Sequence, residues 1–197
     1  MSVFEPKTLT LRDGAAVSLR TPVEDDAPQL IEYLDAMRKE TTGILFAPED
    51  PLPTVEWERN WVRGRREGRG VMILTEDDAG QIVSLCSVEP GGRSRTAHRG
   101  EVGISLRAAW CDRGLGTQLM DELVAWSEAQ PDLDLLTLCV YADNPRAIRV
   151  YEKVGFVHEG RRRWHIKRDG QYVDQIEMSR WVGGDPEPAS TADKPVV

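Results

Sequence analysis

Gly114 and Gly116 lie in a segment whose surroundings indicate a chemical role. They follow an alternating apolar run at Val102–Leu106, and they open an amphipathic stretch with leucines at helical spacing. A strand, a glycine loop and a helix in this order can bind an anion, because glycine lets the backbone approach a ligand closely and the first amides of a helix have no intrahelical acceptor. We therefore expect this loop to bind a pyrophosphate group.

Two other nucleotide-binding loops do not fit this segment. A nucleotide-hydrolase loop requires Gly-x-x-x-x-Gly-Lys-Ser/Thr, which the chain lacks. A dinucleotide-binding fingerprint requires glycine or alanine where this chain has Leu119, and it follows the first strand of a βαβ unit, whereas the strand here is expected to belong to an antiparallel meander. Neither nucleotide hydrolysis nor hydride transfer is indicated.

A second motif begins downstream, at Asn144-Pro145. Asparagine before proline is a normal helix start, and capping alone can explain Asn144. Tyr151 follows seven residues later, which is two helical turns, so it shares a face with Asn144. A core aromatic and a functional phenol are both compatible with this placement.

The block from Val140 to Phe156, together with Arg113-Gly114-Leu115-Gly116, resembles the GNAT superfamily of acetyl-CoA-dependent N-acetyltransferases. The likeness is greatest to the branch with RimJ/RimL-type ribosomal-protein, spermidine and amino-acid N-acetyltransferases. It extends from about Thr8 to Trp181 and is most specific between Glu101 and Phe156. The resemblance implies the GNAT fold, a mixed α/β structure whose mostly antiparallel central sheet of about seven strands has helices on both faces.

The resemblance also implies acetyl-CoA as co-substrate, with its pyrophosphate on the glycine loop, its pantetheine arm along the preceding strand and its amide-rich part against the asparagine. The cofactor-binding residues implied in this way are Ile104, Ser105, Leu106, Arg113, Gly114, Leu115, Gly116, Thr117 and Asn144. Lys153 is a candidate for the coenzyme 3′-phosphate, although a solvated helix charge is the favoured explanation.

Cys111 departs from the family pattern, because the family has arginine or glutamine at this position of the loop. A thiol cannot replace a guanidinium on phosphate. Arg107 and Arg113 are the nearby cations that we expect to compensate.

Two residues are the expected catalytic groups. Acetyl transfer expels a thiolate, and the phenol of Tyr151 can return a proton to it within a desolvated site. The attacking amine must first lose a proton, directly or through water, and Glu101 is the expected base because several family members carry a catalytic glutamate at the start of this strand. An exposed edge carboxylate is the alternative interpretation of Glu101.

The expected reaction is direct attack of a primary amine on the thioester, in a ternary complex and with no side chain as acyl carrier. Cys111 lies at the pyrophosphate end, too far along the cofactor to accept the acetyl group. The expected acceptor is a small molecule, an amino acid or a polyamine. Acidic residues in the segments that line the acceptor pocket in this family favour a cationic acceptor: Glu24, Asp25, Asp26, Glu49 and Asp50. A RimJ/RimL-type protein N-terminal acetyltransferase and a non-catalytic acyl-CoA-binding regulatory module are the alternatives.

The elements expected to position these residues can be placed from periodicity and turn signals. Strand pairs are expected around Asp13-Gly14 at the beginning of the chain and around Asp169-Gly170 at its end. Two helices follow the first pair, the second of them capped by Thr54, and the segment between them is rich in glycine and proline. A meander over 71–75, 82–88 and 102–106, a helix to about 129, a buried strand over 135–140 and the helix after Asn144 complete the expected order.

Composition limits the number of domains, the location and the partners that we expect. The 197 residues have an ordinary apolar share of 40%, which suits one domain over 1–182, and a proline-rich tail over 183–197 that we expect to be disordered. The net charge of −8 argues against nucleic-acid binding, and no apolar run is long enough for a membrane helix. With no readable signal peptide, a cytoplasmic location is expected. The three cysteines and three histidines have no ligand-like spacing, so no metal is expected, and a homodimer is left open.

Overall fold

A computed structural model describes residues 3–184, so the predicted tail lies outside the described residues from 185 onward. The described chain forms one eight-stranded sheet in the order β1-β2-β3-β4-β5-β6-β8-β7. The strands are β1 (Lys7–Thr10), β2 (Ala16–Arg20), β3 (Val71–Glu76), β4 (Ile82–Pro90), β5 (Arg99–Leu106), β6 (Leu135–Tyr141), β7 (Val157–Arg168) and β8 (Gln171–Trp181). Only β5 and β6 pair in parallel, so the mostly antiparallel mixed sheet expected from the sequence is confirmed, with eight strands where about seven were predicted.

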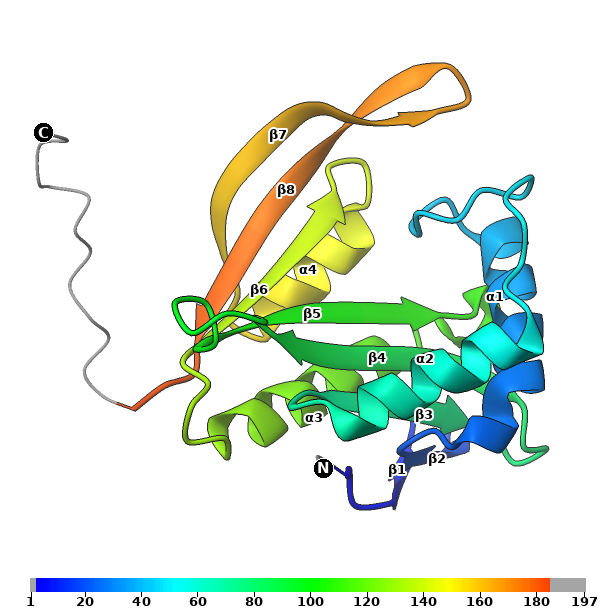
Figure 1. The fold of residues 1–197 in the computed structure, drawn as a ribbon. Coiled ribbons are helices and arrows are strands. Elements are labelled where there is room, and N and C mark those ends of the chain that lie inside the picture. The colour runs from blue at the N-terminus through cyan, green and yellow to red at the C-terminus, as the bar shows by residue number, and fades with distance from the viewer. Residues whose placement is uncertain (1–2, 185–197) are drawn as a thin grey trace, which may run out of the picture.

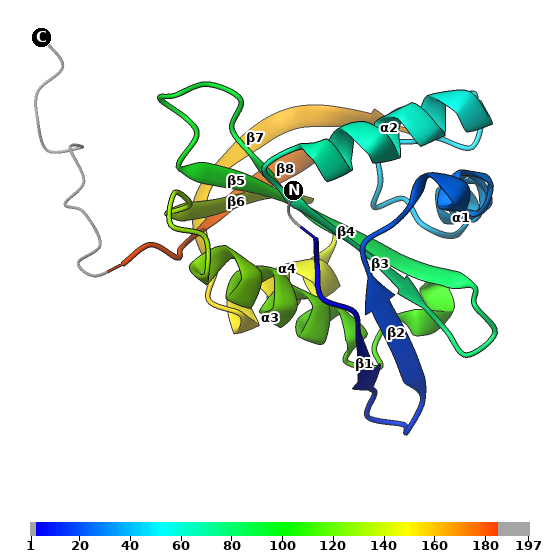
Figure 2. The ribbon, with the colours of Figure 1, turned by 60° about the horizontal axis from the view of Figure 1, so that its bottom comes forward.

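Helices cover both faces of this sheet (Figures 1 and 2). Helices α1 (Ala27–Glu40) and α2 (Val55–Glu67) lie on one face, and α3 (Leu115–Glu128) and α4 (Pro145–Lys153) lie on the other. Short 3₁₀ turns precede α1 at Glu24–Asp26 (η1) and α3 at Ala108–Trp110 (η2). The layered α/β architecture predicted from the sequence is therefore present.

Local sequence signals explain where several elements begin. The Thr54 hydroxyl accepts a hydrogen bond from the amide of Trp57 and caps α2 as predicted. The Asn144 side chain accepts one from the amide of Ala147 at 3.1 Å and caps α4, with Pro145 at its first position. Asp169 and Gly170 both have positive φ, 49° and 76°, the conformation that a tight hairpin turn between β7 and β8 requires.

Two apolar clusters form the core. The larger lies between the sheet and the α3–α4 layer, where Leu115, Leu119 and Leu123 are fully buried. The smaller lies between the sheet and the α1–α2 layer, and it includes Met37 and Val62. The leucine spacing read as an amphipathic helix therefore marks the buried face of α3.

Strands β5 and β6 separate along their length. Their parallel pairing joins Arg99 to Leu135, Gly100 to Leu136 and Glu101 to Thr137, and it stops there. Beyond that point β5 stays paired with β4 as far as Leu106, and β6 stays paired with β8, so the two strands run apart (Figure 1). The result is a wedge that begins beside Glu101 and widens toward the glycine loop.

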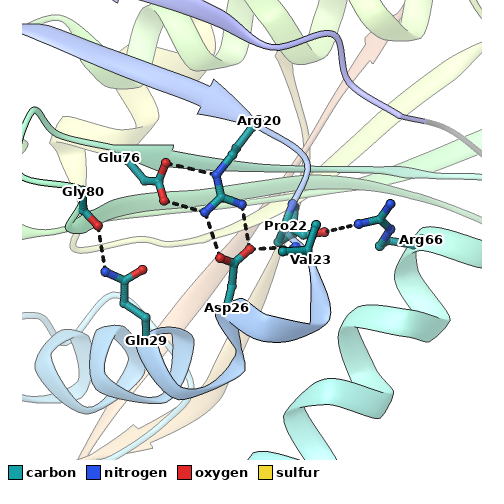
Figure 3. Close-up of polar contacts among 8 residues, drawn as sticks. All are labelled: Arg20, Pro22, Val23, Asp26, Gln29, Arg66, Glu76 and Gly80. Carbon is teal, nitrogen blue, oxygen red and sulfur yellow. Dashed lines mark hydrogen bonds and ion pairs between the residues drawn. The ribbon is translucent and has the colours of Figure 1, made fainter.

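Arg20 on β2 joins the first helix layer to the sheet (Figure 3). Its guanidinium donates to both carboxylate oxygens of Asp26, at 2.7 and 2.8 Å, and to Glu76 on β3 at 3.0 Å. Gln29 on α1 adds a bond of 2.7 Å to the carbonyl of Gly80. Burial alone would raise the pKa of Asp26, but the hydrogen bonds from Arg20 and the Val23 amide outweigh it and leave that pKa lowered.

Replacing Arg20 by methionine is expected to lower the free energy of unfolding by about 2 kcal/mol, between the values for exposed and buried pairs, because it leaves two neighbouring carboxylates unpaired. A carboxyl group with a lowered pKa contributes stability above its unfolded pKa and loses it as pH falls through the folded value. The difference between wild type and variant should therefore shrink below about pH 4. Urea unfolding of the wild type and the variant, at neutral pH and below about pH 4, measures this difference. The control is Arg63→Met, which breaks an exposed pair with Glu24; an equal loss there would contradict a special role of Arg20.

Candidate functional site

A cavity of about 480 Å³ occupies the wedge between β5 and β6. Its walls come from β5, β6, the glycine loop, the first turns of α3, α4 and the segment after α1. Of the residues predicted to form the site, nine line it: Glu101, Ile104, Ser105, Leu106, Gly114, Gly116, Thr117, Asn144 and Tyr151. The topology thus brings together side chains from both sequence motifs.

The glycine loop closes the wide end of the wedge. Gly114 has a φ of 90° and stands immediately before α3, in a conformation that favours glycine. The first hydrogen bond of the helix that reaches back to the loop is donated by the amide of Gln118 to the carbonyl of Gly114, at 3.2 Å. The amides of Leu115, Gly116 and Thr117 consequently have no acceptor within the helix, and they form the positive end of its dipole. Such an end suits an anion.

The two cations expected to compensate for Cys111 are already paired. Arg107 donates to Glu40 at the end of α1, at 2.6 Å from its terminal nitrogen. Arg113 donates to Asp13 at 2.6 Å, and its guanidinium carbon lies 4.2 Å from the centroid of the Trp110 ring. The Arg113 side chain does not line the cavity. In this structure both guanidinium groups join neighbouring segments to the loop, and their compensation for Cys111 stays a prediction.

Tyr151 lies on the cavity face of α4. Its side chain is only 8% exposed and packs against Phe156, with ring centroids 6.2 Å apart. Burial raises the pKa of Tyr151 to about 12, so the phenol keeps its proton at neutral pH. No described residue forms a hydrogen bond with its hydroxyl, which leaves the proton available to a ligand.

Glu101 lies at the narrow end of the wedge, where the β5–β6 pairing stops. A second cavity, of about 380 Å³, lies between the end of α2 and the β4–β5 edge. Among the described residues, Glu101 alone lines both cavities. Glu101 therefore stands between the two cavities.

The other predicted residues lie at the margin. Leu115 is fully buried and contributes its side chain to the core, so only its backbone amide faces the loop. Lys153 is exposed at the end of α4 and does not line the cavity. The lining side chains that were not predicted from the sequence include Arg12, Cys139, Tyr141, Arg146 and Gln175. Cys139 and Tyr141 share a strand face with Thr137, because side chains two residues apart point to the same side, and this period could have identified the two residues from the sequence. Arg12 comes from a distant hairpin, and no local pattern connects it with the cavity.

The segment after α1 forms another wall of the cavity. Thr41, Gly43 and Leu45 contribute to the wall. Arg168 from β7 donates to the carbonyl of Thr42 at 3.1 Å and also pairs with Asp143. The long terminal hairpin therefore holds this segment in place beside Asn144.

The acidic residues expected near an acceptor serve other contacts. Glu24 pairs with Arg63, Asp26 pairs with Arg20, and Asp50 accepts from the Ala47 amide. None of the five lines either cavity. The argument for a cationic acceptor from these residues consequently has no support in the geometry.

The described residues contain neither a metal-binding cluster nor a membrane-spanning helix. Within residues 3–184, no three His, Cys, Asp or Glu side chains gather where they could hold a metal ion. No helix in the same range is both long and apolar enough for a membrane span.

Comparison with known proteins gave matches over most of the chain. The profile of the acetyltransferase (GNAT) domain matches residues 17–157. The L-amino acid N-acetyltransferase AaaT of Escherichia coli (strain K12) is 31% identical over 120 residues, which cover 61% of this chain and 74% of that protein.

Solved structures have the same fold. An acetyltransferase of the GNAT family from Streptococcus pneumoniae superposes with a TM-score of 0.80 at 24% identity, over 85% of this chain and 99% of the other. A GNAT superfamily phosphinothricin acetyltransferase from Sinorhizobium meliloti, solved in complex with AcCoA, gives a TM-score of 0.75 at 18% identity, over 91% and 93% of the two chains.

Proposed function

The chain belongs to the acetyltransferase (GNAT) domain family, and from this premise we propose that it acetylates the primary amine of a small molecule, an amino acid or a polyamine. Membership makes it an acetyl-CoA-dependent N-acetyltransferase. The amino-acid acceptor named for the Escherichia coli relative supports the first of the two acceptor classes. The observation that carries the proposal is the wedge cavity, which has unpaired helix amides at one end and Glu101 at the other.

The residues present fit acetyl-CoA as the group to be held. Gly114 and Gly116 leave the loop amides open to a diphosphate, and these amides lie where the cavity is widest. The edge of β5 that faces β6 has no strand partner over Val102–Leu106, so its backbone groups can bond the amides of a pantetheine arm. The Asn144 side-chain NH₂ has no partner among residues 3–184 and can donate to the same arm. When bound, acetyl-CoA supplies the thioester.

In the proposed reaction, the nitrogen of the acceptor amine forms a bond to the thioester carbonyl carbon, and the carbon–sulfur bond breaks. Glu101 accepts the proton that the ammonium must lose, directly or through water. Tyr151 gives its proton to the leaving sulfur, because a phenol that stays neutral at physiological pH can serve as an acid. The nitrogen still carries one surplus proton after the attack, and the transfer of this proton through water to the Tyr151 phenolate completes the amide and restores the phenol. Glu101 returns to its charged form by releasing its proton to solvent. The products are the N-acetyl compound and the free thiol of the coenzyme.

Cys139 adds a second thiol to the cavity, besides Cys111. Burial raises the pKa of both thiols, which disfavours the nucleophilic thiolate. The variant Cys139→Ser is therefore expected to keep turnover within about twofold of wild type, since direct attack needs no acyl carrier. Intact-mass spectrometry after incubation with acetyl-CoA alone provides the second measurement. A stable gain of one acetyl group that disappears in the serine variant would contradict direct attack.

The acceptor is tested by measuring thiol release from acetyl-CoA in the presence of amino acids, polyamines and peptides with free N-termini. Release with amino acids or polyamines is expected. Release with peptides alone would favour a protein N-terminal acetyltransferase, and binding of acetyl-CoA with no release for any amine would favour a non-catalytic regulatory module.

A further inference from the structure

The glycine-loop end of the wedge cavity carries one arginine without a partner. Arg107, Arg113 and Arg146 each face a carboxylate, the last at 3.5 Å from Asp112. Arg12 also lines the cavity, yet its guanidinium forms no hydrogen bond or ion pair with any residue between 3 and 184. Of the two arginines that line the cavity within the described residues, Arg12 is thus the one free to bind a ligand.

The turn that carries Arg12 is fixed on both sides of it. Leu11 is 4% exposed and belongs to the main core, and Asp13 accepts the ion pair from Arg113. Gln118 on α3 adds a bond of 3.4 Å to the carbonyl of Thr10. The β1–β2 turn is therefore attached to the loop that precedes α3, and Arg12 lies against that loop while remaining exposed.

The Arg12 side chain lies directly against Gly114. A Cβ added at Gly114 would meet the Arg12 Nε at 3.1 Å and its Cγ and Cδ at 3.5 Å. The φ of 90° favours glycine here, and the absence of a Cβ lets the Arg12 side chain lie this close. The contact places a guanidinium beside the unpaired amides that begin α3.

We propose that Arg12 binds the diphosphate of coenzyme A, and that it supplies the positive charge that Cys111 does not bring to the loop. The inference rests on the proposed function, because it assumes coenzyme A in the wedge. A guanidinium and backbone amides that point at the same anion give charge-assisted bonds from two directions, and the planar fork of arginine matches two phosphate oxygens. The coenzyme site of this chain would thus be completed by the N-terminal hairpin.

The test is the variant Arg12→Gln, which keeps a polar side chain but removes the charge. Calorimetry at low salt should show about tenfold weaker binding of coenzyme A, the loss of one charge-assisted contact. Binding of 3′-dephospho-CoA, which retains the diphosphate, should weaken by the same factor, and binding of pantetheine, which has no phosphate, should not change. If the variant weakened binding of coenzyme A alone, Arg12 would contact the 3′-phosphate, and the assignment to the diphosphate would be wrong. Equal affinities of wild type and variant for coenzyme A would also overturn the assignment.

Two further variants separate local from general charge effects. Arg95→Gln removes an exposed positive charge, with no ion pair to any residue of 3–184, from the β4–β5 loop outside both cavities, and is expected to leave coenzyme affinity unchanged. A similar loss of affinity in Arg95→Gln would mean that the effect of Arg12→Gln reflects only the net charge of the protein, which would contradict the proposal. The double variant Arg12→Gln with Cys111→Arg places a guanidinium on the opposite side of the loop and should regain most of the affinity. If the double variant binds coenzyme A no better than Arg12→Gln does, Arg12 does not supply the charge that Cys111 lacks, and the proposal is contradicted.

The same titrations separate failure of this inference from failure of the proposed function. If the wild-type protein binds coenzyme A and Arg12→Gln binds it equally well, the role of Arg12 is wrong and the acetyltransferase proposal stands. If the wild-type protein binds no coenzyme A at millimolar concentration, both fail.

Discussion

The variant Tyr151→Phe is expected to lower kcat by about 100-fold while the affinity for acetyl-CoA stays within about twofold of wild type. The substitution removes only the hydroxyl, so the buried ring keeps its packing against Phe156. It also removes the one proton that the cavity offers from a buried phenol on α4. An interaction made only in the transition state changes kcat and not ground-state binding.

The pH dependence of this loss provides a second criterion. Burial raises the pKa of Tyr151 to about 12, and the group acts in its protonated form. The ratio of wild-type to variant kcat should therefore be constant between about pH 6 and pH 9, because the phenol does not ionise in that range. A ratio that falls with rising pH would mean that an acid with a lower pKa is responsible.

Stopped-flow or steady-state thiol release measures kcat, and calorimetry measures binding. Tyr172→Phe is the inert control, since Tyr172 is 61% exposed on β8 and lines neither cavity. Tyr141→Phe makes the same change elsewhere in the cavity wall. If Tyr141→Phe carried the large loss and Tyr151→Phe did not, the proton donor would be the tyrosine of β6.

The sequence was sufficient to predict the helices, the strands and the two motifs, because the signals for them are local. The Thr54 and Asn144 caps, the leucine face of α3 and the Asp169-Gly170 turn each depend on residues a few positions apart. Helix α2 shows the limit of such reasoning. Its apolar residues include Trp57, which is 55% exposed, whereas Glu58 is 7% exposed and burial raises the pKa of its carboxyl group. The register of a helix face is set by its tertiary neighbours, and a buried carboxyl group opposes the usual preference.

The site depends on relations that the sequence does not encode locally. The wedge exists because β5 leaves β6 after Glu101, and that divergence follows from the pairing of both strands with their outer neighbours. The contact of Arg12 with Gly114 requires the first hairpin to dock against α3. The pairing of Arg107 with Glu40 likewise depends on where α1 ends. Each of these contacts joins segments far apart in the chain, so single-sequence reasoning could not identify Arg12 as a candidate for the phosphate.

The variant Glu101→Gln is expected to lose activity in proportion to how much of the amine is protonated. A primary amine has a pKa of about 10, so at pH 7 only about one molecule in a thousand is ready to attack, and a base must deprotonate the rest. Removing that base should lower kcat/KM by about 100-fold at pH 7. Near pH 9.5 the free amine is abundant, and the loss should shrink to a few fold.

The structure supplies a matched control for this profile. Glu89 lies directly opposite Glu101 in the β4–β5 ladder and on the same face, but it lines only the second cavity. Glu89→Gln should therefore leave the shape of the profile unchanged. Because Glu101 begins the wedge and lines both cavities, a carboxylate at this point can accept a proton from an amine that approaches from the side opposite the glycine loop. Parallel profiles for wild type and Glu101→Gln from pH 6 to pH 9.5 would exclude Glu101 as the base.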